Sequence, residues 1–200
     1  MSSRILTKYN LLRTKVLHSI GYLKFVIKSY EVGVNGRCIP AMIFDVGQTV
    51  GFLVFNTDTQ KFTLVSQTRF ATFERHVNPR FLELEILSER INPGEDPVNV
   101  VLRECQRITG YHPKKDNISQ IGSFDISPAY LTERMMIYFV EISNGDKRGD
   151  KTSDDEIKIV EVKPDQISDL RYENLPITDM KTSLSIQWWL LNHKVAKMLP

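Results

Sequence analysis

The most informative part of this sequence is Ile91–Tyr111, Ile-Asn-Pro-Gly-Glu-Asp-Pro-Val-Asn-Val-Val-Leu-Arg-Glu-Cys-Gln-Arg-Ile-Thr-Gly-Tyr. It opens with the turn signal Asn-Pro-Gly, and Glu95, Asp96 and Pro97 then favour the first turn of a helix. Gly110 stands where a helix ends in a left-handed cap. The stretch therefore predicts a turn, a helix of about three turns and a glycine stop. Its apolar face, at helical spacing, is Val100, Val101, Cys105 and Ile108.

Strand-like segments lie on both sides of this helix, and strands in series with few helices indicate the α+β class. Residues 4–18 show helix-like spacing, Gly33–Gly36 is a hairpin signal, and Asn144–Asp155 is expected to be a polar, mobile loop. A C-terminal helix is expected at Ser183–Lys197. The expected strands are Tyr22–Val32, Arg37–Asp45, Thr49–Asn56, Lys61–Ser66, Phe81–Ile86, Ile118–Ile126, Arg134–Ile142 and Ile157–Val162.

The composition is that of an ordinary globular protein. Of 200 residues, 42% are hydrophobic and 25% charged, and the net charge is +2, so the length suits one domain with at most a small appendage. A charge this close to zero argues against a nucleic-acid-binding protein, and no apolar run approaches the ~20 residues that span a bilayer. Cys38 and Cys105 lack zinc-ligand spacing, and we expect Cys105 to be a buried hydrophobe.

The N-terminal segment contains no Asp or Glu between Met1 and Tyr30 but several Lys and Arg residues. Such a segment is compatible with a mitochondrial presequence or with a folded segment that has a solvated basic face. Because Tyr22–Tyr30 has the composition of a strand, we favour the folded segment and a cytoplasmic location, with a mitochondrial one as the alternative.

The stretch around the helix resembles the signature of the Nudix superfamily, hydrolases of nucleoside diphosphates linked to another moiety. That signature runs Gly, five residues, Glu, seven residues, Arg-Glu, an apolar residue, any residue, Glu-Glu, any residue, Gly and an apolar residue. Glu89 replaces its opening glycine, and Arg107-Ile108 replaces its Glu-Glu pair. The matching positions are Glu95, Arg103, Glu104, Cys105, Gly110 and Tyr111.

Further motifs resemble the ADP-ribose and GDP-mannose branch of that superfamily, in the same order along the chain. Leu84-Glu85 matches its Leu-Glu, and the turn that follows in the branch corresponds to Leu87-Ser88-Glu89. The other matches are Val65–Thr72, Ser127–Glu133, Asp154–Ile157 and Ile186–Leu191. The resemblance implies a Nudix-type α/β/α sandwich with a mixed sheet over residues 47–200, preceded by a small antiparallel sheet over residues 1–46 that serves dimerisation. It also implies a homodimer and a nucleotide-sugar ligand.

The family hydrolyses pyrophosphates with the help of magnesium, a cation that prefers carboxylate oxygens. Glu104, Arg107 and Ile108 lie on one helix face, where an active member would present three carboxylates. We therefore predict a pseudoenzyme, with little metal binding or hydrolysis, that binds a nucleotide sugar or has a structural or regulatory role. The alternative is an active, magnesium-dependent diphosphatase with a rearranged metal site drawn from Glu85, Glu89, Glu104 and Glu133.

The resemblance assigns candidate roles, each beside a simpler one. Glu104 is catalytic or only part of a surface ion pair, and Arg69 binds substrate or is a surface residue at the end of a strand. Arg107 is placed to bind the pyrophosphate in place of the metal. The candidate catalytic residues are Glu104, Glu133 and Asp155, of which the last two are alternatively solvated acids of loops. The candidate substrate-binding residues are Arg69, Phe70, Glu85 and Arg107, with Phe70 alternatively a packing residue.

The candidate structural residues are Glu95, Arg103 and Gly110, with Glu95 alternatively only an acid of the first helical turn. The candidate metal ligands are Glu104 and Glu89, or none.

Overall fold

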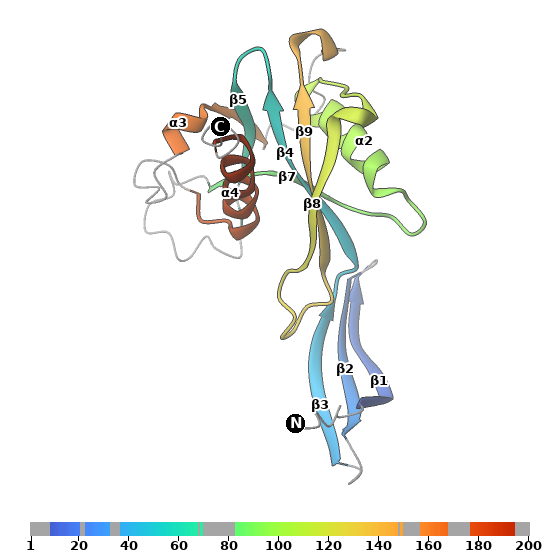
Figure 1. The fold of residues 1–200 in the computed structure, drawn as a ribbon. Coiled ribbons are helices and arrows are strands. Elements are labelled where there is room, and N and C mark those ends of the chain that lie inside the picture. Colours follow the sequence, from blue (N-terminus) through green and yellow to red (C-terminus); the bar gives the residue numbers. More distant parts are fainter. Residues whose placement is uncertain are drawn as a thin grey trace. The chain divides into compact units, whose positions relative to one another are not determined.

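The computed structural model describes residues 9–20, 23–32, 37–67, 69, 83–147, 149, 157–167 and 177–194. The chain divides into two compact units, one of Met1–Gln48 with Asp125–Arg134 and one of Thr49–Phe124 with Met135–Pro200. In the first unit, an antiparallel sheet contains β1 (Tyr9–Ile20), β2 (Leu23–Val32) and β3 (Arg37–Asp45) in the order β1-β2-β3 (Figure 1). The two strands expected over residues 22–45 are therefore confirmed within the described residues.

The helix-like spacing over residues 4–18 was misleading. From Tyr9 onward this segment is strand β1, whose register pairs Thr14 with Lys28 and Val16 with Val26. The register shifts twice, between Leu11 and Arg13 and between Val16 and His18, and each shift interrupts the strict alternation that identifies a strand. Residues 4–8 of the predicted helix and the predicted hairpin turn at Gly33–Gly36 lie outside the described residues.

The second unit is built on a seven-stranded sheet with the order β10-β5-β4-β9-β8, in which β6 also pairs with β5 and β7 with β4. The antiparallel β4–β5 hairpin turns at residues 57–60, between the two strands expected at Thr49–Asn56 and Lys61–Ser66. The strands are β4 (Gln48–Asn56), β5 (Lys61–Gln67), β6 (Glu83–Glu85), β7 (Leu87–Arg90), β8 (Ile118–Asp125), β9 (Arg134–Ile142) and β10 (Lys158–Val162). The short helices are η1 (Lys115–Asn117) before β8, η2 (Asn144–Asp146) after β9 and α3 (Pro164–Ile167) after β10.

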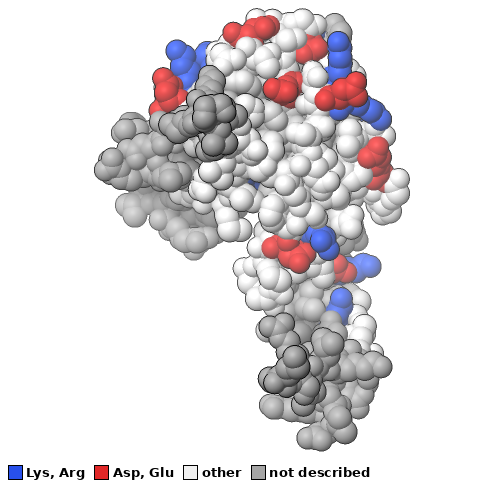
Figure 2. Space-filling model, in the orientation of Figure 1, with Lys and Arg blue, Asp and Glu red and all other residues white. Residues whose placement is uncertain are grey.

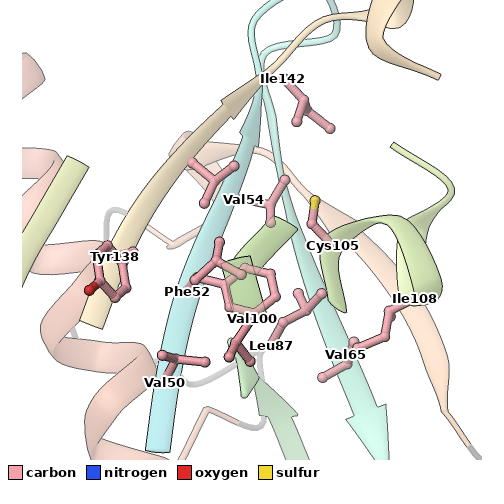
Figure 3. Close-up of a cluster of buried hydrophobic side chains, with 12 residues drawn as sticks. Val50, Phe52, Val54, Val65, Leu87, Val100, Cys105, Ile108, Tyr138 and Ile142 are labelled. Carbon is pink, nitrogen blue, oxygen red and sulfur yellow. The ribbon is translucent and has the colours of Figure 1, made fainter. Parts of the chain in front are cut away.

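Helices α2 (Pro97–Thr109) and α4 (Met180–Lys194) cover opposite faces of this sheet (Figure 1). Figure 3 shows one face, where side chains of β4 meet those of α2 in a buried cluster that includes Val50, Phe52, Val54, Val100, Cys105 and Ile108. Because successive strand residues point to opposite faces, Phe55 reaches the other side and lies 5.1 Å from the ring of Trp189 on α4. The predicted α/β/α sandwich is confirmed.

Helix α2 begins at Pro97, so Glu95 and Asp96, which were expected in its first turn, precede it, while Gly110 ends it as predicted. The Asp96 side chain accepts a hydrogen bond from the Val98 N–H at 3.0 Å, which satisfies one of the free donors of the first turn. Gly110 adopts φ 78° and donates its N–H to Gln106 O at 2.9 Å, the left-handed ending that glycine accepts without steric cost. Together these two caps define where α2 begins and ends.

Two local predictions were wrong. The segment Leu87-Ser88-Glu89, expected as a turn, is part of β7 and pairs with β4, with Glu89 opposite Val50. Leu87 is fully buried in the strand, and this burial contributes more free energy than an exposed turn would. The start of the polar loop is also ordered, because buried Asp146 accepts hydrogen bonds from Ser143 N and Oγ at 2.7 and 2.8 Å.

Candidate functional site

A chain of alternating charges connects the loop before α2, the helix itself and strand β7. Glu95 is bonded to Arg103, and Arg103 Nε donates to Glu104 Oε1 at 3.0 Å. Arg107 Nε donates to the other oxygen, Glu104 Oε2, at 2.6 Å. The guanidinium of Arg107 also lies 3.9 Å from Glu89 Oε2. Glu95, Arg103, Glu104, Arg107 and Glu89 therefore form one connected series, which we call the α2 charge chain.

Glu104 is the centre of this chain, and it is only 4% exposed. A buried carboxylate is costly unless its oxygens are hydrogen-bonded and its charge is compensated. Each oxygen here accepts a bond from a different arginine. The hydrogen bond to Glu104 is also the main reason that the pKa of Arg103 is raised, so Arg103 keeps its charge at neutral pH. Glu104 is thus a buried ion-paired residue, whereas the simpler of its two predicted roles was a surface ion pair.

Glu95 and Arg103 brace the loop against the helix, which fits their predicted structural role. The second oxygen of Glu95 accepts hydrogen bonds from Asn92 N and Nδ2 at 3.2 and 2.9 Å. Asn92 begins the turn that ends at Gly94, whose φ of 79° suits glycine. The turn is therefore fastened to α2 through Glu95 and Arg103.

The residues of this region do not suit a divalent cation. Magnesium requires several oxygen ligands, yet both oxygens of Glu104 are held by arginines and Arg107 places its own positive charge between Glu104 and Glu89. Ile108 is 3% exposed within the hydrophobic core and has no donor atom. Over the parts of the chain that the structure describes, no three His, Cys, Asp or Glu side chains are grouped as a metal site.

Glu85 belongs to a second cluster, at the end of β6. Arg69 binds it through two parallel hydrogen bonds of 2.7 Å, and Lys181 Nζ donates to Oε2 at 3.2 Å. Burial alone would raise the pKa of Glu85, but the hydrogen bond from Arg69 and the charges of Lys181 and Arg69 together hold that pKa below its ordinary value. Glu85 therefore stays ionised and serves to hold Arg69.

Helix α4 begins at this same cluster. Asp179 accepts hydrogen bonds from Lys181 Nζ at 2.7 Å and from the Thr182 N–H at 3.0 Å, which caps the first turn. The Thr182 hydroxyl donates to Asp179 at 2.5 Å and accepts the Ile86 N–H at 2.8 Å. Sequence analysis did not identify Lys181, Asp179 or Thr182. An Asp just before a helix is a recognisable cap signal, but nothing in the sequence indicates that Lys181 reaches Glu85.

Three candidate residues are not among those that the structure places at the two clusters described above: Glu133, Phe70 and Asp155. Glu133 lies in the compact unit that contains Asp125–Arg134, and its carbonyl accepts the Ile126 N–H at 3.1 Å. Phe70 and Asp155 lie outside the described residues. For these three residues the assigned roles stay predictions.

The visible surface carries charges of both signs. Figure 2 shows Lys and Arg side chains interspersed with Asp and Glu on a largely uncharged face, without a continuous basic surface among the described residues of that face. In the described part of the chain, no helix has both the length and the hydrophobicity to cross a membrane.

No family model matches this chain, but comparison with known proteins shows relatives of two kinds, a curated sequence and a solved structure. The chain is 29% identical over 133 residues to the ADP-ribose pyrophosphatase of Bacillus subtilis (strain 168), a match that covers 66% of this chain and 66% of that protein. The match thus spans slightly less than two thirds of the relative's length. The structure is also similar to the crystal structure of an ADP compounds hydrolase, with a TM-score of 0.72, 15% identity, and coverage of 95% of this chain and 98% of the other. At that identity the structural likeness shows the fold.

Proposed function

This chain has the Nudix fold and resembles the ADP-ribose pyrophosphatase branch of that superfamily, and from this premise we propose that it binds a nucleotide sugar of the ADP-ribose type while hydrolysing it weakly or not at all. One observation carries the proposal. Both oxygens of Glu104, the carboxylate that remains at the centre of the signature helix, are already occupied by Arg103 and Arg107.

Hydrolysis of a pyrophosphate needs an activated water and neutralisation of phosphate charge, which divalent cations supply in related enzymes. In this chain Glu104 is not available to bind a cation or to accept a proton without first giving up an arginine partner. Losing one partner of a buried carboxylate is costly. We therefore expect a rate far below that of an enzyme whose carboxylates converge on a metal.

Binding is less affected by these changes than catalysis. The side chains of Arg69 and Arg107 are 40% and 35% exposed, so an incoming ligand can reach each guanidinium while that guanidinium holds a carboxylate. A planar guanidinium held in this way suits the oxygens of a diphosphate. We infer that these two arginines contact the ligand.

The first test measures binding and turnover on one preparation. Binding of ADP-ribose and of GDP-mannose is measured by calorimetry, and release of nucleoside monophosphate is followed with magnesium or manganese present. We expect saturable binding of at least one ligand and no release above background. Glu161→Gln serves as a control, because Glu161 pairs with Lys61 at an exposed position on β10 and β5. Clear metal-dependent release by the unchanged protein would contradict the proposed loss of hydrolysis.

The second candidate function is an active diphosphatase with a rearranged metal site, and one observation favours it. The contact between Glu89 and Arg107 is long, at 3.9 Å, and the Glu89 side chain is 37% exposed, so this carboxylate can turn away from Arg107. If the protein does turn over ADP-ribose, Glu89→Gln should reduce kcat. Unchanged kcat in that variant would exclude Glu89 as a ligand.

We further propose that the protein is a homodimer located in the cytoplasm. The three-stranded sheet exposes apolar side chains, including Leu11 (54%), Val16 (53%) and Met42 (64%), which is typical of an interaction surface. Light scattering coupled to size-exclusion chromatography tests the dimer, and a monomer at micromolar concentration would contradict it. Microscopy of the fluorescently tagged chain separates the cytoplasm from the mitochondrion.

A further inference from the structure

We propose that Arg107 is a built-in cation, which supplies to Glu104 and Glu89 the positive charge that a divalent metal would otherwise supply. The chain then needs no divalent cation to hold α2 against β7 and the preceding loop. This inference concerns the same region as the proposed function but does not depend on whether a nucleotide sugar binds, because its test uses only the metal and the protein.

The first support is position. Glu104 projects from the middle of α2 and Glu89 from strand β7, yet one guanidinium lies within 4 Å of a carboxylate oxygen of each. The two carboxylates therefore converge on a single place, and that place is occupied by a covalently attached positive charge. A metal at the same place would have to displace the guanidinium first.

The second support is charge balance. The α2 charge chain contains three carboxylates and two guanidinium groups, so its net charge is −1 at neutral pH. Without Arg107, Glu104 would still be paired with Arg103, whereas no other cation of the α2 charge chain would lie beside Glu89. A guanidinium keeps its charge at every accessible pH, so the balance does not vary with the concentration of any ion.

The third support is the burial of Ile108. In the related signature this position is a carboxylate, but here its side chain is part of the core beneath α2. The apolar residue at position 108 and the cation at position 107 both disfavour metal binding. Both favour a helix that is fixed by its own residues.

The test measures the melting temperature of the protein in EDTA and in increasing magnesium, manganese or calcium. We expect the unchanged protein to melt at the same temperature in all of them. Arg107→Glu brings a third carboxylate beside Glu104 and Glu89, so this variant should melt lower in EDTA and recover in divalent cation. A site occupied at about 100 times its dissociation constant should raise the melting temperature by roughly 5–10 °C for a chain of this size.

Two further variants complete the test. Lys115→Glu makes the same change of charge at an exposed site, and its melting temperature should not depend on the metal. Arg107→Gln removes the cation and adds only a neutral amide oxygen, a weaker ligand than a carboxylate. If Arg107→Glu does not fold, this milder variant should still gain a smaller metal-dependent stabilisation. Adding Glu89→Gln to either Arg107 variant should lower the apparent metal affinity about tenfold.

The possible results are distinct. A folded Arg107→Glu or Arg107→Gln variant that is as indifferent to metal as the unchanged protein would overturn the inference. So would an unchanged protein that is itself stabilised by magnesium to the same extent as Arg107→Glu. Neither result bears on nucleotide-sugar binding, which calorimetry measures separately.

Discussion

Replacing Glu85 by Gln should destabilise the protein strongly, although the two side chains have nearly the same shape. Glu85 is 2% exposed and accepts two hydrogen bonds from Arg69 and one from Lys181. A hydrogen bond to a charged group contributes about 1.5–3 kcal/mol. The uncharged glutamine oxygen can accept one of these hydrogen bonds. The glutamine NH2 group is a donor and would face the N–H donors of Arg69 or Lys181, with which it cannot bond.

The size of the effect follows from what each cation can recover. The Arg69 side chain is 40% exposed and regains water, while Lys181, at 16%, keeps its bond to Asp179. This recovery reduces the loss to about 2–4 kcal/mol. For a chain of this length the melting temperature should fall by roughly 5–15 °C. The matched control, Glu161→Gln, removes an exposed pair and should cost about 0.5 kcal/mol or less.

The pH dependence gives a second measure of the same interaction. The pKa of Glu85 is lower in the folded protein than the ordinary value of 4.5, so its ion pairs stabilise the fold above pH 4.5 and that stabilisation is lost as the pH falls through the lowered pKa. The difference in free energy of unfolding between the unchanged protein and Glu85→Gln should therefore narrow in acid. Urea titrations at pH 7, 5 and 3.5 would show it. A loss below about 1 kcal/mol at pH 7, or a constant difference across these pH values, would refute the reasoning.

Three other results are expected. The affinity for ADP-ribose, measured by calorimetry, should be the same in EDTA and in magnesium, and a loss of binding in EDTA would show that the ligand is held through a metal. Ile108→Glu should lower the free energy of unfolding by about 3 kcal/mol or more, because it places a charge in the core, whereas Ile108→Val should cost roughly 1 kcal/mol; equal urea midpoints would contradict the burial of Ile108. In a Cys38→Ser background, Cys105 should resist a thiol reagent at pH 8 until the protein unfolds, since burial raises the pKa of its thiol to about 11, and rapid labelling of the native protein would contradict that environment.

The sequence predicted the elements whose signals are local. The turn at Asn92–Gly94 and the stop at Gly110 each depend on residues within a few positions of one another, and both agree with the structure. Glu95 and Asp96 were expected in the first turn of the helix, but they precede it, with Asp96 as the N-cap residue. Strands with an uninterrupted pattern were also predicted correctly, such as Arg134–Ile142. Strand β1 was not, because its two register shifts disturb the alternation on which recognition of a strand depends.

In the candidate site, too, the contacts between residues close in sequence were predictable and the distant ones were not. Residues 104 and 107 lie three positions apart on a helix, so their ion pair is expected from spacing alone. The approach of Glu89 is not, because it requires that β7 be a strand beside α2, and the sequence instead resembled a turn there. Lys181 reaches Glu85 across 96 positions of sequence, a separation at which no periodicity carries information.

The contact between Glu89 and Arg107 has a consequence for the history of the sequence. With a carboxylate at position 107, Glu89 would face like charges at short range, and with glycine at position 89, Arg107 would lose one of its two carboxylate neighbours. The two positions should therefore co-vary among homologous chains, with arginine at 107 accompanying an acid at 89, and a carboxylate at 107 accompanying a small uncharged residue. Substituting a carboxylate for Arg107 alone would produce a less stable protein, so a return to the carboxylate would require a change at position 89 as well.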